Sequence, residues 1–164
     1  MKTVKEPVWN RIMRNFIVTM SRLRAAIRKV EKEMQRMGLW VSGMEDTQVY
    51  LTPVHIWYGW VTTKGKDIFI PRLSLSTWIE REPWTLEDVL RHEYAHILAA
   101  HAPEKFHGWP RGRDRVSKYA LTDKAEDLAE TVKYFVKHRG KLPKRWRKKE
   151  DRKSTRLNSS HVSQ

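Results

Sequence analysis

Two histidines four positions apart, with a glutamate directly after the first, are the residues in this sequence best suited to chemistry. They are His92, Glu93 and His96, in the stretch RHEYAHILAA over residues 91–100. On an α-helix, positions i and i+4 lie one turn apart on the same face, so both imidazoles can bind one metal ion. Glu93 is rotated by about 100° around the helix axis and would lie beside that ion. The pattern predicts a zinc site in which Glu93 is the general base that accepts a proton from water.

Zinc is the cofactor that this set of side chains predicts. The sequence contains no cysteine, so thiolate metal sites, cysteine nucleophiles and disulfide bonds are excluded. A bound metal must then be held by histidine, aspartate or glutamate, and zinc accepts imidazole and carboxylate ligands without redox chemistry. The structural alternative is a half-buried helix whose two histidines are hydrogen-bonded to other protein groups. The third metal ligand decides between these interpretations.

Histidines further along the chain are the first candidates for the third ligand. The metzincin pattern needs a glycine three positions after the second histidine and a histidine three positions later, but Ala99 and Ala102 stand there. That class is therefore excluded. His101 follows His96 by five positions, and a continuing helix turns it away from the ion. His107, in the segment FHGWP, could return to the site from a loop.

The carboxylates of AEDLAET, residues 125–131, are the better candidates. Glu126 and Glu130 are four positions apart, so a second helix can direct both toward the histidine-bearing helix. We expect Glu126 to complete a site with two histidines and one glutamate. Glu130, one turn later, could accept a hydrogen bond from a ligating imidazole and fix its orientation. The alternative is that these acids only complement the dipole of their own helix.

HEYAH, followed about thirty residues later by YALTDKAEDLAET, resembles the gluzincin group of zinc metallopeptidases. The similarity is greatest to the anthrax lethal factor-like branch and to related uncharacterised bacterial and phage zincin domains, and it covers residues 45–138. It implies an α+β zincin-like fold, a zinc cofactor and hydrolysis of peptide bonds in a protein or peptide substrate. It implies that Glu126 ligates zinc and that Glu130 supports a ligating histidine. It also implies that Tyr119, seven residues before Glu126, helps to stabilise the transition state.

Two other interpretations stay open. The segment HEYAHILAAHAPEKFHGWP is partly similar to SprT-like minimal zincins, which take a third histidine shortly after HExxH and of which some act on DNA-bound proteins. The spacing to His101 is one residue short of that pattern, and the tyrosine and the second glutamate motif would then be unexplained. The other interpretation is a nucleic-acid-binding module with a structural zinc site. Three protein ligands leave one coordination position open, which favours catalysis over a closed structural site.

The first half of the chain predicts a helix followed by a sheet. Apolar residues at steps of three and four over residues 8–37 predict a long amphipathic helix that covers the core and ends at Gly38. Residues 48–75 are rich in β-branched and aromatic residues, which predicts two or three antiparallel strands with a hairpin around Gly65. By the resemblance to zincins, residues 67–75 would be an edge strand that aligns the substrate backbone.

Two more helices are predicted in the second half of the chain. Thr85 is a suitable N-cap for the active-site helix over residues 86–100. A loop over residues 102–118 follows. The helix that supplies the glutamates spans residues 123–138, with a cap near Thr122 and a stop at Gly140.

Length and charge predict one domain with a basic tail. The 164 residues suffice for a single domain over residues 1–140. The formal net charge is +14, and residues 141–164 carry nine Lys or Arg against two acids, which is half of that excess. We expect this tail to be solvated, with at most a weak contact to nucleic acid through its positive charge. Its last residues, STRLNSSHVSQ, resemble translated cloning sequence and are left out of the fold prediction.

The sequence also predicts where the protein resides. The segment MKTVKEPVWNRIMRN lacks the apolar core of a signal peptide, and no apolar run reaches membrane-spanning length. We therefore expect a cytoplasmic protein that makes no use of a membrane, and the resemblance leaves room for a phage-encoded one.

Overall fold

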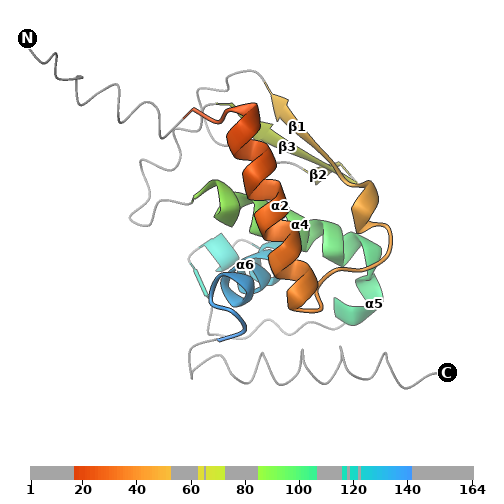
Figure 1. The fold of residues 1–164 in the computed structure, drawn as a ribbon. Helices are drawn as coiled ribbons and strands as arrows, with labels where there is room; N and C mark the ends of the chain where they lie inside the picture. Colours follow the sequence, from red (N-terminus) through yellow and green to blue (C-terminus); the bar gives the residue numbers. More distant parts are fainter. Residues whose placement is uncertain are drawn as a thin grey trace, which may run out of the picture.

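The protein has a mixed α+β architecture in which helices pack around α4 and a small sheet lies at one side (Figure 1). The helices are α2 (Met20–Arg36), α4 (Leu86–His101), α5 (Pro103–Phe106) and α6 (Lys124–Lys137), with short 3₁₀ turns η1 (Met44–Asp46) and η2 (Tyr119–Leu121). The strands are β1 (Gln48–Thr52), β2 (Thr63–Lys64) and β3 (Asp67–Pro71). This computed structural model describes residues 17–52, 63–64, 66–72, 85–106, 116–117, 119–121 and 123–141.

α2 begins later than the apolar pattern predicted. Residues 8–16 of the predicted helix lie outside the described residues, and residues 17–19 are not helical. Thr19 is extended, and its side chain accepts a hydrogen bond from the backbone N–H of Arg22 at 3.2 Å. Val18 donates its N–H to the carbonyl of Arg72 at 2.8 Å, which ties this segment to the end of β3. The cap at Thr19 and this bond to the sheet replace helical hydrogen bonds, so the prediction of one unbroken helix is wrong at residues 17–19.

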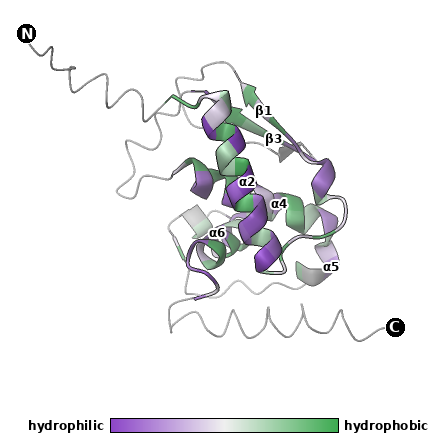
Figure 2. Ribbon diagram, viewed as in Figure 1, coloured by the Kyte–Doolittle hydropathy of each residue, from purple (hydrophilic) through white to green (hydrophobic). Residues whose placement is uncertain are grey.

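α2 covers the core with one face, as its periodicity predicted. Leu23, Ala26, Val30 and Met34 are buried, whereas the remaining positions are mostly polar (Figure 2). The helix ends where expected, because Gly38 adopts a φ of 65° and lets Leu39 donate its N–H back to the carbonyl of Met34 at 2.9 Å. This is the Schellman arrangement, which satisfies carbonyls that the last turn leaves unpaired.

The sheet has the order β1-β3-β2, and its longer pair is parallel. The prediction of an antiparallel sheet is therefore wrong for β1 and β3, which pair from Gln48 opposite Asp67 onward. Residues 53–66 separate the two strands, a length sufficient for the crossover that a parallel pair requires. β2 pairs antiparallel with β3, with Lys64 opposite Asp67, as the predicted hairpin around Gly65 requires. β-Branched residues favour strands but do not specify the direction of pairing.

β3 occupies the centre of the sheet, not an edge. Ile68 and Ile70 are buried in the core cluster, which also contains the apolar residues of α2 and α4. Because β1 lies on one side of β3 and β2 on the other, the prediction that this strand is an edge for substrate alignment is wrong among the described strands. Residues 73–75 of the predicted strand lie outside the described residues.

α4 begins and ends close to its predicted bounds. Thr85 and Asp88 form a reciprocal capping box, in which each side chain accepts a hydrogen bond from the other's backbone N–H. This satisfies two donors that the first turn would leave unpaired. The helix extends through His101, and the short helix α5 follows Ala102, where a loop was predicted.

α6 is capped by Asp123, one residue after the predicted Thr122. The Asp123 side chain accepts from the backbone N–H of Glu126 at 2.9 Å, so the cap also fixes the first turn that carries this glutamate. Gly140, with a φ of 82°, donates its N–H to the carbonyl of Phe135 at 2.8 Å and closes the helix as predicted. The predicted tail beyond Lys141 lies outside the described residues. Among the described helices, none has the length and apolar content needed to cross a membrane.

Candidate metal centre

α4 is held from two sides, and this fixes which way its histidines point. Toward α2, Arg91 donates from Nε to Glu33 Oε2 at 2.9 Å, and the Tyr94 hydroxyl donates to Glu31 Oε1 at 2.9 Å. Both Arg91 and Tyr94 are buried. The face turned toward α6 then carries the two histidines, since positions 92 and 96 lie on a different side of the helix from positions 91 and 94. The contacts with α2 therefore set the rotation of α4 about its axis.

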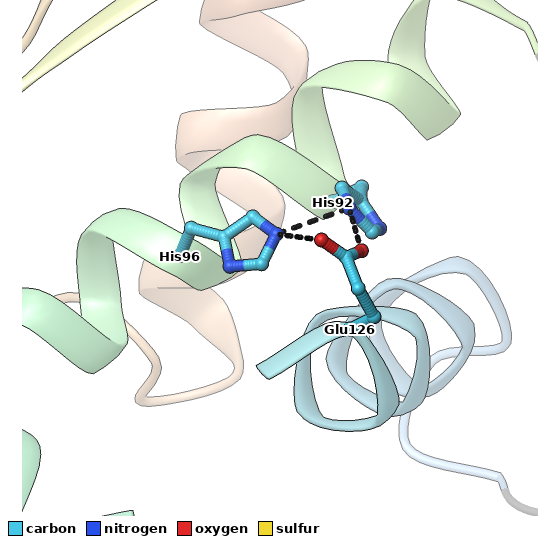
Figure 3. Close-up of side chains that lie close together, drawn as sticks. All are labelled: His92, His96 and Glu126. Carbon is cyan, nitrogen blue, oxygen red and sulfur yellow. Dashed lines mark hydrogen bonds and ion pairs between the residues drawn. The ribbon is translucent and has the colours of Figure 1, made fainter. Parts of the chain in front are cut away.

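His92 and His96 of α4 converge with Glu126 of α6, as Figure 3 shows. The two histidine Nε2 atoms lie 3.1 Å apart. His92 Nε2 lies 3.0 Å from Glu126 Oε2, and His96 Nε2 lies 3.5 Å from Glu126 Oε1. His92 is buried, and the other two side chains are partly buried. The side chains expected from the sequence to share a site are thus brought together.

The spacing of these donor atoms fits a zinc ion. Zinc binds imidazole nitrogen and carboxylate oxygen at about 2.0–2.2 Å, and a tetrahedron of that size has edges of about 3.3 Å. The two histidine nitrogens lie 3.1 Å apart, close to this edge, and each lies 3.0 or 3.5 Å from a different oxygen of Glu126. One ligand atom from each of the three residues lies within 4.8 Å of the others, so the group could hold a metal ion. The residues present fit the cofactor that the sequence predicted.

Glu130 determines which nitrogen His92 presents to the site. This carboxylate is fully buried, and His92 Nδ1 donates to its Oε1 at 2.8 Å. With the proton on Nδ1, the lone pair of a neutral His92 lies on Nε2, the atom that faces Glu126. The predicted supporting role of Glu130 agrees with this contact.

Two residues that the sequence analysis missed complete the environment of Glu130. Lys133 Nζ lies 2.8 Å from Oε2 and 2.7 Å from Oε1, and the Ser117 hydroxyl donates to Oε2 at 2.6 Å. Burial raises the pKa of Glu130, but the hydrogen bond from His92 and the charge of Lys133 outweigh it and hold the pKa below its usual range. Lys133 follows Glu130 by three positions on one helix, a spacing that could have revealed it. Ser117 lies before η2, and nothing local in the sequence indicates its contact.

The histidines and Glu126 also share protons when no cation lies among them. Burial lowers the pKa of His92, but hydrogen bonds to Glu126 and Glu130 raise it more, to about 9. Burial raises the pKa of Glu126, but hydrogen bonds from His92 and His96 lower it more, to about 2. Both shifts favour an imidazolium beside a carboxylate when no cation is bound. A metal ion must displace that proton in order to bind.

Glu93 lies next to this cluster in a nearly dry environment. Glu93 is 6% exposed. Burial raises the pKa of Glu93, the charge of Glu126 raises it further, and His92 lowers it, with a resulting pKa of about 8. A cation held by the three donors would favour the charged carboxylate again. Glu93 thus has the surroundings of a group that exchanges a proton near neutral pH.

Tyr119 stands at the first position of η2, shortly before α6. Its backbone is described, but its side chain lies outside the described part of the structure. Its predicted contribution to the transition state therefore stays a prediction.

His101 points elsewhere than to the cluster. A Cβ placed on Gly43 would lie 2.8 Å from both Cε1 and Nδ1 of His101, so this ring packs against the turn that leads into η1. Gly43 also has a φ of 93°, which a side chain would disfavour. His107 lies outside the described residues. Of the three candidates for the third ligand, Glu126 is the one that the structure places with His92 and His96.

Comparisons of the chain with protein family models, curated proteins and solved structures give no match. The gluzincin resemblance therefore rests on the two motifs quoted above. The arrangement of the side chains is an independent observation, since it follows from how α4 and α6 pack.

Proposed function

We propose that this protein is a zinc-dependent metallopeptidase of the gluzincin type, which hydrolyses peptide bonds in a protein or peptide substrate. The observation that supports the proposal most is the convergence of His92, His96 and Glu126, whose ligand atoms lie within 4.8 Å of one another. The zincin-like assignment of the α+β fold belongs to the same proposal, as does the cytoplasmic location expected from the sequence.

Each side chain of the site would have a distinct role in holding the ion. His92, through Nε2, His96, through Nε2, and one oxygen of Glu126 would hold the ion. When bound, zinc lowers the pKa of a water ligand and polarises a peptide carbonyl. Glu130 keeps the Nδ1 proton of His92 in place, which leaves Nε2 available and fixes the plane of the ring. Lys133 balances the charge of Glu130 inside the core.

Glu93 would move the proton in this reaction. Its carboxylate would accept a proton from the attacking water and then donate it to the amine nitrogen of the leaving group. The low exposure of Glu93 supports this role, because a carboxyl group shielded from bulk water keeps its proton until a reacting group takes it. Tyr119, whose role comes from the resemblance, would help to stabilise the oxyanion.

A closed structural zinc site is the weaker alternative. Structural sites use four protein ligands, whereas the group found among the described residues offers three. His101, the nearest further histidine on α4, packs against Gly43 and is not directed at the cluster. This contact also weakens the SprT-like alternative with His101 as the third ligand.

The experiment that tests the proposal compares the full chain with Glu93→Gln. Both proteins are loaded with zinc and incubated with a library of unstructured peptides of mixed sequence, and cleavage is followed by mass spectrometry. We expect the original chain to cleave peptides and a chelator to abolish the cleavage. Glu93→Gln should bind zinc equally well but lose about a hundredfold or more in rate, because an amide accepts no proton. Equal cleavage by both proteins would exclude Glu93 as the base, and a zinc-loaded chain without any cleavage would contradict the peptidase assignment.

A further inference from the structure

The outer face of α2 carries a regular series of cations. Arg24, Arg28, Lys32 and Arg36 are spaced four positions apart, and all four are exposed. We call these four residues the α2 basic column. None of their side chains forms an ion pair or hydrogen bond with any residue in the described part of the chain. Each step of four residues turns about 40° beyond a full turn of the helix, so the column follows a ridge that winds by about 120° across the outer face of α2.

The two acidic residues of α2 direct their carboxylates toward α4 and form no ion pair with the column among the described residues. Glu33 binds Arg91 through both of its oxygens, at 2.9 and 3.1 Å. Glu31 accepts the hydroxyl hydrogen of Tyr94 at 2.9 Å. Lys29, beside the column, is a further exposed cation. The outer face of α2 therefore presents positive charge with no carboxylate of its own helix.

The dimensions of the column match a polymer with regularly spaced negative charge. Twelve residues separate its ends, which corresponds to about 18 Å at 1.5 Å per residue. Duplex nucleic acid carries one negative charge per about 1.7 Å of axis, so about ten phosphates face the same length. Several phosphates therefore lie within the length that the column spans.

We propose that the α2 basic column binds the phosphate backbone of duplex nucleic acid, without reading its sequence. This surface differs from the basic tail and does not depend on the proposed peptidase activity. Arginine and lysine donate to phosphate oxygens, and such contacts position a protein on a duplex without discriminating bases. Three of the four residues in the column are arginine, the side chain that binds phosphate with two parallel donors.

The composition of the same face argues against three other partners. A membrane surface would require an apolar face that can enter the lipid, but the apolar face of α2 is buried in the core. Single-stranded nucleic acid is bound through aromatic stacking, and none of the other exposed residues within the helix after Met20 is aromatic: Ser21, Arg22, Ala25, Lys29 and Gln35. A specific acidic peptide would need an apolar pocket for an anchoring side chain, and this face offers none among its described residues.

The column and the candidate metal centre face different directions. α4 contacts α2 with Arg91 and Tyr94, and it contacts α6 with His92. α2 thus lies on the other side of α4 from Glu126, as the close-up also shows (Figure 3). Nucleic acid on the column would leave the metal centre open, so the two properties can be tested separately.

The test measures binding of the full chain to a fluorescently labelled 30-base-pair DNA duplex by anisotropy, between 50 and 200 mM NaCl. The variant replaces all four column residues with glutamine: Arg24→Gln, Arg28→Gln, Lys32→Gln and Arg36→Gln. The slope of log affinity against log salt should become shallower by about 3.6, which is 0.9 for each lost phosphate contact. Over this fourfold change in salt, the original chain should therefore lose about a hundredfold more affinity than the variant.

A matched control removes four exposed cations elsewhere: Lys66→Gln, Arg72→Gln, Arg139→Gln and Lys141→Gln. Both variants lower the formal charge from +14 by four, so a general effect of charge would change both slopes equally. We expect the control to keep most of the original slope. The proposal would be overturned if the salt slope became shallower by the same amount in both variants. It would also be overturned if the slope of the column variant did not change. Glutamine is a good helix former, and circular dichroism together with zinc content verifies that both variants are folded.

Competitors decide the class of partner. Competitor concentrations are expressed per negative charge. On this scale, we expect unlabelled duplex to displace the labelled DNA at a lower concentration than single-stranded DNA, poly-glutamate or phosphatidylserine vesicles do. Stronger competition by any of the other three would overturn the assignment to duplex nucleic acid and would identify the partner class that the column prefers.

Discussion

At the scale of single residues, the candidate centre depends on how protons and charges are placed around His92. Its Nδ1 faces the buried carboxylate of Glu130, and its Nε2 faces Glu126 and His96. Lys133 and Ser117 supply two further donors to Glu130, so this carboxylate stays charged in the core. A charged Glu130 keeps the proton on Nδ1, and this leaves Nε2 as the atom that could bind a metal ion.

The zinc affinities of single variants distinguish the roles of Glu126, Glu130 and His101. Glu126→Ala removes a ligand and should weaken zinc binding by a large factor. Glu130→Ala should weaken it on the order of 10–100-fold, because the ring of His92 loses its orientation. His101→Ala should change little, since that ring packs against Gly43. Competition with a chelator measures all three, and a large loss for His101→Ala with none for Glu126→Ala would contradict the assignment.

Zinc affinity should also rise with pH. The pKa of His92 is raised from 6.5 to about 9, so this histidine holds a proton at neutral pH that zinc must displace. Since the protonated form is favoured below about 9, affinity should increase by at least tenfold per pH unit up to that value and then level off. Chelator competition at pH 7, 8, 9 and 10 measures this, after correction for the chelator's own protonation. An affinity independent of pH over this range would show that no such proton is displaced.

At the scale of secondary-structure elements, Asp88 connects the three helices. It closes the capping box of α4 with Thr85, accepts from Arg91 at 2.8 Å and pairs with Lys137 of α6 at 2.8 Å. Arg91 in turn binds Glu33 of α2. The packing of α4 against α2 and α6 is therefore supported by a connected set of charges as well as by apolar contact.

Asp88→Asn should lower the free energy of unfolding by about 2–3 kcal/mol at neutral pH, because Arg91 and Lys137 lose a buried counter-charge. Burial raises the pKa of Asp88, but Lys137 and Arg91 together lower it by more, so its folded pKa lies below 3.8. A depressed pKa stabilises the folded state above about pH 4, and this contribution is lost as pH falls through the folded value. The difference between the two proteins should therefore be constant from pH 5 to 7 and shrink below pH 4. Urea unfolding at each pH measures it, and a difference that persists at low pH would show that charge is not its cause.

At the scale of the whole molecule, the described fold closes before the basic tail begins. α6 ends with the hydrogen bond from Gly140 to Phe135, and the core cluster draws its residues from position 18 to position 136. Half of the formal charge excess lies beyond this point, in residues 141–164. The α2 basic column, with four cations, is a separate positive surface within the described fold.

Truncation after Lys141 should leave the fold and the zinc site intact. The removed segment contributes no residue to the described core, so the thermal midpoint measured by circular dichroism should shift by only a few degrees. Duplex binding should weaken and become less sensitive to salt, but a salt-dependent part should remain because the α2 basic column is still present. Unfolding of the shortened chain would show that the tail belongs to the domain.

The sequence alone determined the features that depend on neighbours within a few positions. The convergence of His92 and His96, the cap at Thr85 and the stops at Gly38 and Gly140 follow from helical periodicity and from hydrogen bonds between nearby residues. Tertiary structure decided which distant groups meet. It placed Glu126 against both histidines, and it turned His101 toward Gly43.

Other features were beyond the reach of local patterns for the same physical reason. The parallel pairing of β1 with β3 depends on the path of the intervening chain, and the late start of α2 depends on a hydrogen bond from Val18 to Arg72. The contact of Ser117 with Glu130 likewise joins segments that local propensity treats separately. Periodicity and capping act over one or two turns, whereas strand direction, helix rotation and buried ion pairs are fixed by packing between elements.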